Sequence, residues 1–137
     1  MFRFRRVNID GKSITETYAA GEEVLPGKLV KLVGGKFMNA TDAEGRLYIV
    51  NPAFHEGKTI ADAIKAGETV VADYVEQGRE FAMRVEAATY KKDQAIKLGE
   101  VTVAYCQEDV TLEDVDFIRV RVALFKRGTI CTLQNKI

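Results

Sequence analysis

The sequence predicts a mainly β protein, an antiparallel β-barrel or a jelly-roll-like sandwich with one short helix. Apolar and polar residues alternate in several short segments, most clearly over residues 117–125, and this period of two is typical of strands with one buried face. Glycine-containing turns separate these segments at short intervals, as in all-β domains. Only the stretch after Thr59 carries the start signal of a helix.

Aromatic and basic side chains alternate at the start of the chain. They are Phe2, Arg3, Phe4, Arg5 and Arg6. Such an alternation predicts an extended segment, which is either an edge strand of its own sheet or a free arm that orders on a partner. We therefore expect an N-terminal arm over residues 1–12 and a single β domain over residues 13–137. The domain begins with a polar strand over residues 13–19.

The next segment predicts a hairpin followed by a central strand. A proline-glycine turn at residues 25–27 precedes two strands, over residues 28–33 and 36–40. Gly34-Gly35 joins them and is the two-residue connection that primed hairpin turns favour. Residues 46–50 are apolar at both odd and even positions, which indicates a strand that is covered on both faces.

A loop with the only histidine of the chain precedes the predicted helix. This loop covers residues 51–58 and contains Phe54 and His55. Thr59 then serves as a helix cap, because Asp62 stands three positions further on in a variant of the capping box. We expect a helix of about two turns that covers one open end of the β structure.

Residues 66–87 are predicted to form a β-hairpin on which the other strands pack. The first arm, residues 69–75, is rich in β-branched residues. The second arm alternates apolar with charged side chains, so Glu80 and Arg84 are expected on its solvent face. Gly78 supplies the left-handed conformation that the short turn between the arms needs.

The last third of the chain predicts four more strands. They cover residues 94–98, 101–106, 117–125 and 129–133. Cys106 and Cys131 fall in two of these strands, have no CxxC spacing, and are expected to be buried, reduced thiols. Arg119 and Arg121 face solvent on the third strand, but they lack the interleaved aromatic side chains of an RNA-binding strand.

An acidic loop over residues 107–116 separates the second of these strands from the third. Its acidic residues are Glu108, Asp109, Glu113, Asp114 and Asp116. The loop lacks the alternating ligand spacing and the central glycine of a calcium-binding EF-hand. The sequence therefore favours a solvated loop, or a patch that meets arginines on another subunit.

The sequence contains no recognisable catalytic motif. A histidine-based triad would have to use His55, and neither a dinucleotide-binding nor a phosphate-binding glycine loop occurs. We therefore predict that the protein is not an enzyme and holds no cofactor or metal ion. The charges balance, with 20 Lys and Arg against 20 Asp and Glu, so no overall field attracts the chain to nucleic acid or to a membrane.

The residues also bear on cellular location. The longest apolar runs fall short of a membrane-spanning helix, and the first residues have no apolar core of a secretion signal. Synthesis in a cytoplasm is therefore expected, with neither a nucleic acid nor a membrane as partner.

Three segments have the features of contact surfaces: the N-terminal arm, the histidine loop and the acidic loop. We predict that their exposed aromatic and charged side chains bind a partner protein or another copy of the chain. These residues are Phe2, Arg3, Phe4, Arg5, Arg6, Phe54, His55, Glu108, Asp109, Glu113 and Asp114.

The order of turns and strands over residues 24–125 resembles that of the head decoration (cement) proteins of tailed bacteriophages. The similarity lies in LPGKLVKL, GKF, GRLYIVN, AIKAGETVVADYV and DFIRVRVALF, read in that order. It implies a β-barrel or jelly-roll-like module that binds the outside of an icosahedral capsid at contacts between major capsid proteins. It also implies a dimer or trimer that is made in the host cytoplasm, is carried on the virion and has no catalytic residues.

A second function remains open from the sequence. A carbohydrate-binding β-sandwich domain used in host attachment has the same predicted architecture. Tryptophan, the usual residue on which sugars stack, is absent, but five tyrosines are present as substitutes.

Overall fold

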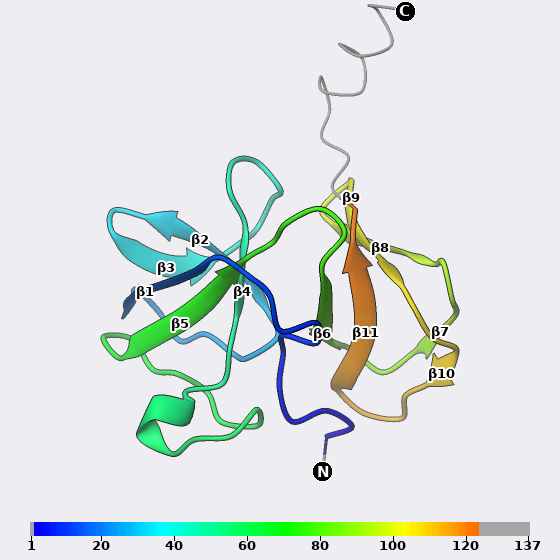
Figure 1. The fold of residues 1–137 in the computed structure, drawn as a ribbon, viewed down its shortest axis with the longest axis horizontal. Helices are drawn as coiled ribbons and strands as arrows, with labels where there is room; N and C mark the ends of the chain where they lie inside the picture. Colours follow the sequence, from blue (N-terminus) through cyan, green and yellow to red (C-terminus); the bar gives the residue numbers. More distant parts are fainter. Residues whose placement is uncertain (1, 124–137) are drawn as a thin grey trace, which may run out of the picture.

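A computed structural model of the chain describes residues 2–123. Two β structures lie side by side, a closed barrel built from the first five strands and a four-stranded sheet built from later ones (Figure 1). Almost every strand pair is antiparallel, so the mainly β barrel prediction is confirmed. Within the described range no helix is long and apolar enough to cross a membrane.

The barrel strands follow the order β1-β3-β2-β4-β5. Their bounds are β1 (Thr15–Ala20), β2 (Leu29–Val33), β3 (Lys36–Asn39), β4 (Tyr48–Val50) and β5 (Thr69–Tyr74). Gly34 and Gly35 have φ angles of 59° and 79°, the positive values that a primed turn requires at both positions. All residues of β4 are buried, as the sequence predicts.

The second sheet has the order β6-β11-β9-β8, with a two-stranded ribbon, β7 with β10, beside it. The bounds are β6 (Glu80–Val85), β7 (Thr89–Tyr90), β8 (Ala95–Leu98), β9 (Val101–Cys106), β10 (Val110–Thr111) and β11 (Asp116–Val122). Arg119 and Arg121 are exposed on β11 between buried apolar residues, and Cys106 is buried. Cys131 and the predicted strand over residues 129–133 lie outside the described residues.

The prediction of a hairpin over residues 66–87 is wrong. β5 pairs with β1 and β4 in the barrel, whereas β6 pairs with β11 in the sheet. The turn at Gly78 does form, with a φ of 84°, but the chain passes through it from the barrel into the sheet. The alternation of side chains identifies a strand and its buried face, but not the strand with which it pairs.

The helix predicted from Thr59 is also absent. The Asp62 carboxylate accepts hydrogen bonds from the Thr59 backbone nitrogen at 2.7 Å and from its hydroxyl at 3.2 Å, so the cap contacts close a turn. Ile64 then pairs with Val24 in a β-bridge and is buried in the barrel core. An isolated helix of two turns is only marginally stable, so the burial of Ile64 in the core outweighs the local helix signal. The one helical element described is a 3-10 turn, η1 (Phe54–Glu56).

Two hydrophobic cores share β4 as a common wall. Tyr48 and Val50 belong to the barrel core, whereas Ile49 between them belongs to the core beneath the four-stranded sheet. Phe81 and Phe117 are fully buried members of that second core. Because successive side chains of a strand point to opposite faces, three residues of one strand pack in both halves of the molecule.

Candidate contact surface

The N-terminal residues lie against the sheet of their own chain. The Val7 carbonyl accepts a hydrogen bond from the Ala82 nitrogen at 2.8 Å, and the Ile9 nitrogen donates to the Glu80 carbonyl at 3.2 Å. Val7 itself is fully buried. Residues 7–9 therefore cover the edge of β6 that β11 leaves open, through an isolated β-bridge between Asn8 and Phe81, whereas residues 2–6 form no strand.

A buried arginine joins this segment to the rest of the fold. The Phe2 ring meets Phe117 edge-on with 5.1 Å between centroids, and the Arg84 guanidinium lies 5.1 Å and 4.9 Å from the two ring centroids. Arg84 also donates to the carbonyls of Pro26 and Ile60, both at 2.9 Å. The expectation that Arg84 faces solvent is therefore wrong, and its burial lowers the pKa of its guanidinium.

The N-terminal arm and the acidic loop meet in an ion pair. Arg3 donates to the Glu108 carboxylate through both terminal nitrogens, one of them at 3.1 Å, and to the Phe117 carbonyl at 2.9 Å. Burial acts to raise the pKa of Glu108, but the hydrogen bond from Arg3 and one from the Arg119 backbone outweigh it and lower this pKa. Two patches predicted to bind partners therefore bind each other within the chain.

Several of the other expected partner-binding residues line two separate hollows, and N-terminal residues contribute to both. Arg6 lines a pocket of about 430 Å³ together with Phe54 and His55. Phe2 and Arg3 line a second hollow together with residues 110–116, which include Glu113 and Asp114. In Figure 1 η1 lies at the lower left, the N-terminus at the bottom and the β10 segment at the lower right of the view. We call this composite surface, residues 2–6, 54–56 and 108–116, the N-terminal edge.

Charged groups without partners remain on the N-terminal edge. Arg5 and Arg6 are exposed, as are Glu113 and Asp114, and none of the four forms an ion pair within residues 2–123. Asp109 differs, because its carboxylate accepts a hydrogen bond from the backbone nitrogen of Lys92 at 2.9 Å. The edge thus has a free basic part beside η1 and a free acidic part before β11.

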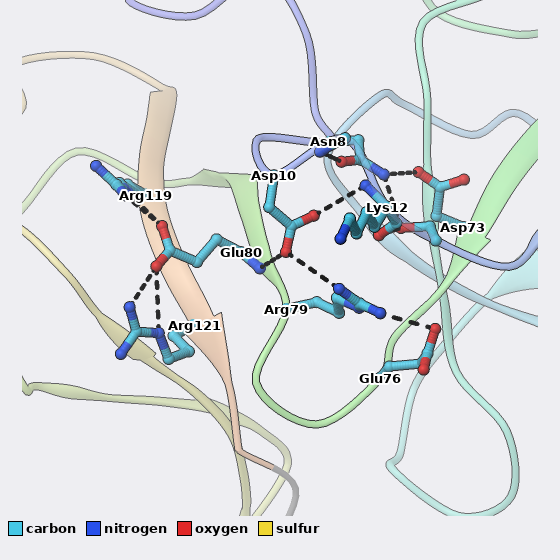
Figure 2. A network of polar contacts seen from close by, with 11 residues as sticks. Asn8, Asp10, Lys12, Asp73, Glu76, Arg79, Glu80, Arg119 and Arg121 are labelled. Carbon is cyan, nitrogen blue, oxygen red and sulfur yellow. Dashed lines mark hydrogen bonds and ion pairs between the residues drawn. The ribbon is translucent and has the colours of Figure 1, made fainter.

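Sequence reasoning missed Asp73, which is 2% exposed on β5. Its two carboxylate oxygens accept hydrogen bonds from the Asn8 amide at 2.9 Å and from the Thr15 hydroxyl at 2.7 Å; Figure 2 shows Asn8 pointing toward it. A signal exists in the sequence, since Asp73 is the single charged residue inside the otherwise apolar run TVVADYV. Buried carboxylates need such donors, because burial without them is costly.

Glu80 is the second buried carboxylate that the sequence places wrongly. It lies between Arg119 and Arg121 in Figure 2 and accepts hydrogen bonds from both, at 2.5 Å from the Arg119 Nε and 3.2 Å from the Arg121 Nε. The Arg121 hydrogen bond is the main cause that lowers the pKa of Glu80. These two arginines are therefore engaged with a carboxylate inside the chain.

A larger groove, of about 650 Å³, lies between the barrel and the sheet. Its lining is mainly apolar and includes Leu29, Met83 and Ile96, with charges of both signs at Lys28 and Glu86. β8 contributes to this groove, and no strand among the described residues pairs with its outer edge. None of the expected partner-binding residues lines the groove.

The composition of these sites limits their chemistry. Among residues 2–123 no group of three or more His, Cys, Asp or Glu side chains is placed to hold a metal ion. In comparisons with known proteins, no protein-family model matches the chain and no curated protein matches its sequence.

Proposed function

We propose that the chain is a capsid decoration protein, a structural protein of the virion that binds the outside of an icosahedral phage head. The N-terminal edge supports this proposal: N-terminal residues line one hollow with Phe54 and His55 and a second hollow with Glu113 and Asp114. Arg5, Arg6, Glu113 and Asp114 are exposed there and form no ion pair within residues 2–123. Mixed, unpaired charges of this kind suit protein partners, because they set orientation and exclude wrong partners.

The proposed mechanism is mechanical rather than chemical. A rigid β body that bridges neighbouring major capsid proteins adds interface area to the shell and thereby stabilises it. Many copies on a closed lattice multiply modest individual contacts. The opposite charges of the edge also complement each other between copies, so assembly as a dimer or trimer accompanies capsid binding in this proposal.

The test is co-sedimentation of the purified protein with heads of the tailed phage that encodes it, with light scattering to measure its mass alone. The amount of protein that sediments with the heads is expected to saturate at a fixed molar ratio to the shell protein. The double charge reversals Arg5→Glu with Arg6→Glu, and Glu113→Lys with Asp114→Lys, are each expected to weaken binding about tenfold or more. These side chains are exposed and unpaired, so the fold does not depend on them.

The matched control reverses two exposed charges on the barrel, Lys36→Glu and Glu44→Lys, away from the N-terminal edge. It should bind like the unchanged protein. A protein that stays in the supernatant with the heads would refute the decoration role. Equal binding by the control and the edge variants would show that the capsid contact lies elsewhere on the molecule.

A further inference from the structure

We propose that the pocket between the N-terminal arm, η1 and the outer face of the barrel binds one pyranose unit of a glycan. This inference goes beyond the decoration role and does not depend on it. The pocket has a volume of about 430 Å³, within the usual range of ligand sites, about 300–1,000 Å³. Its lining combines a buried carboxylate, amides, hydroxyls and an exposed aromatic ring.

Asp73 forms the acceptor on the floor of the pocket. Its carboxylate is held by Asn8 and Thr15, which each donate one hydrogen bond to a different oxygen. A carboxylate offers about four lone-pair sites, so each oxygen keeps one free site. Two neighbouring sugar hydroxyls can donate to these sites, and because Asn8 and Thr15 fix the carboxylate in advance, a ligand loses little entropy in ordering it.

Phe54 supplies an aromatic wall. Its side chain is 58% exposed, although it stands next to Pro52 and Ala53, which are buried and fix the base of η1. A large exposed aromatic ring on a rigid support is available for a ligand to pack against. The apolar C–H face of a pyranose stacks on such a ring while its hydroxyls point to polar groups.

The rim supplies donors that nothing in the fold uses. The Arg6 guanidinium and the Asn51 side-chain amide line the pocket and have no hydrogen-bond partner among the described residues. They complement the acceptor on the floor, because each sugar hydroxyl both donates and accepts. Ligands of other kinds fit less well: an anion without a proton to donate cannot use the Asp73 acceptor on the floor, and the polar lining disfavours a purely apolar ligand.

A metal ion is also a poor match for this pocket. The pocket offers a single carboxylate, and both of its oxygens already accept hydrogen bonds from neutral donors. Hard cations such as calcium need six or more oxygen ligands, usually with several carboxylates. The combination of one fixed acceptor, free donors and an aromatic face therefore points to a neutral polyhydroxyl ligand.

The test uses saturation-transfer NMR with free glucose, galactose, mannose, rhamnose and N-acetylglucosamine at millimolar concentration. At least one of these sugars should receive saturation from the protein. The Phe54→Ala change should weaken binding about tenfold through loss of stacking, and Asn51→Ala should weaken it several-fold through loss of one hydrogen bond, roughly 1 kcal/mol. Neither side chain forms a hydrogen bond or ion pair within residues 2–123, so the fold should tolerate both changes.

Tyr18→Ala is the matched control, because Tyr18 is an exposed aromatic residue on β1 that does not line the pocket. It should bind sugar like the unchanged protein. Asn51 lies outside the N-terminal edge, so Asn51→Ala should weaken sugar binding several-fold and still sediment with phage heads, which separates this inference from the decoration role. The inference is overturned if no sugar of the panel receives saturation, or if Phe54→Ala and Asn51→Ala bind as well as the control.

Discussion

The guanidinium of Arg84 joins three parts of the chain that are distant in sequence. It bonds the carbonyl of Pro26 in the turn before β2 and that of Ile60 after η1, and it packs against Phe2 and Phe117. A buried cation without a carboxylate partner is stable only when carbonyls and aromatic faces replace water around it. Arg84 therefore holds the arm, the barrel and the sheet together.

Replacing Arg84 by methionine should lower the free energy of unfolding by about 2–4 kcal/mol, because two buried carbonyls lose their donor. Methionine keeps much of the packing volume, so the loss of stability can be attributed to the lost polar contacts of Arg84. Urea unfolding followed by circular dichroism measures it. Lys97→Met on β8 is the control, since Lys97 is exposed; an equal, small effect in both variants would contradict the role of Arg84.

Glu80 predicts a dependence of stability on pH. Its pKa is lowered from 4.5 in the folded protein, first by the hydrogen bond from Arg121 and further by Arg119, although burial opposes both. A carboxylate with a lowered folded pKa stabilises the protein fully above its unfolded pKa, and this stabilisation is lost as the pH falls through the folded pKa.

Glu80→Gln should therefore cost about 1–3 kcal/mol at neutral pH, the usual loss for hydrogen bonds to a charged group. The difference from the unchanged protein should shrink as the pH falls below 4.5. Urea unfolding at a series of pH values measures both quantities. Glu113→Gln, at an exposed position that forms no ion pair within residues 2–123, is the control and should leave the stability at neutral pH unchanged. A pH-independent cost of Glu80→Gln would argue against the assigned ion pairs.

At the scale of elements, the turn before β2 decides how closely the barrel approaches the sheet. Gly27 has a φ of 84°, and a Cβ at this position would lie 2.3 Å from the Phe117 ring and 2.9 Å from the Arg84 nitrogen. The Gly27 carbonyl accepts a hydrogen bond from that same nitrogen at 3.0 Å. Both the backbone conformation and the close contact therefore require glycine.

Gly27→Ala should lower the free energy of unfolding by about 3 kcal/mol, the sum of backbone strain and overpacking. Gly35→Ala is a matched control, because Gly35 has a similar φ of 79° but nothing within 4 Å of an added Cβ. It should cost only about 1–2 kcal/mol. Thermal and urea unfolding of the two variants compare them directly, and equal costs would show that the approach to Phe117 is unimportant.

The whole molecule should unfold as one unit, because β4 contributes to both cores. Ile49 is fully buried and packs with the sheet, while its neighbours on the same strand pack inside the barrel. Ile49→Ala should cost about 2–5 kcal/mol and should reduce the protection of β5 and β11 amides equally in hydrogen exchange. Ile14→Ala, at a position 57% exposed, is the control; loss of protection in β11 alone would indicate two independent units.

The sequence by itself determined the mainly β class, most strand positions and the turn at Gly34-Gly35, because alternation and glycine conformation are local properties. It also identified the arm, the histidine loop and the acidic loop, whose role in binding stays a prediction. It did not identify Asp73, although Asp73 is the single charged residue of the run TVVADYV, and it did not identify Asn51, since a lone polar residue in a loop carries no periodic pattern.

Only the tertiary structure decided which strands pair, that Ile64 forms a β-bridge and is buried in the barrel core where a helix is predicted, and that Arg3 forms an ion pair with Glu108. It also decided that Arg84 is buried. Each of these outcomes depends on contacts between residues far apart in the chain, and their burial and hydrogen bonding outweigh the weaker local preferences that a sequence pattern records.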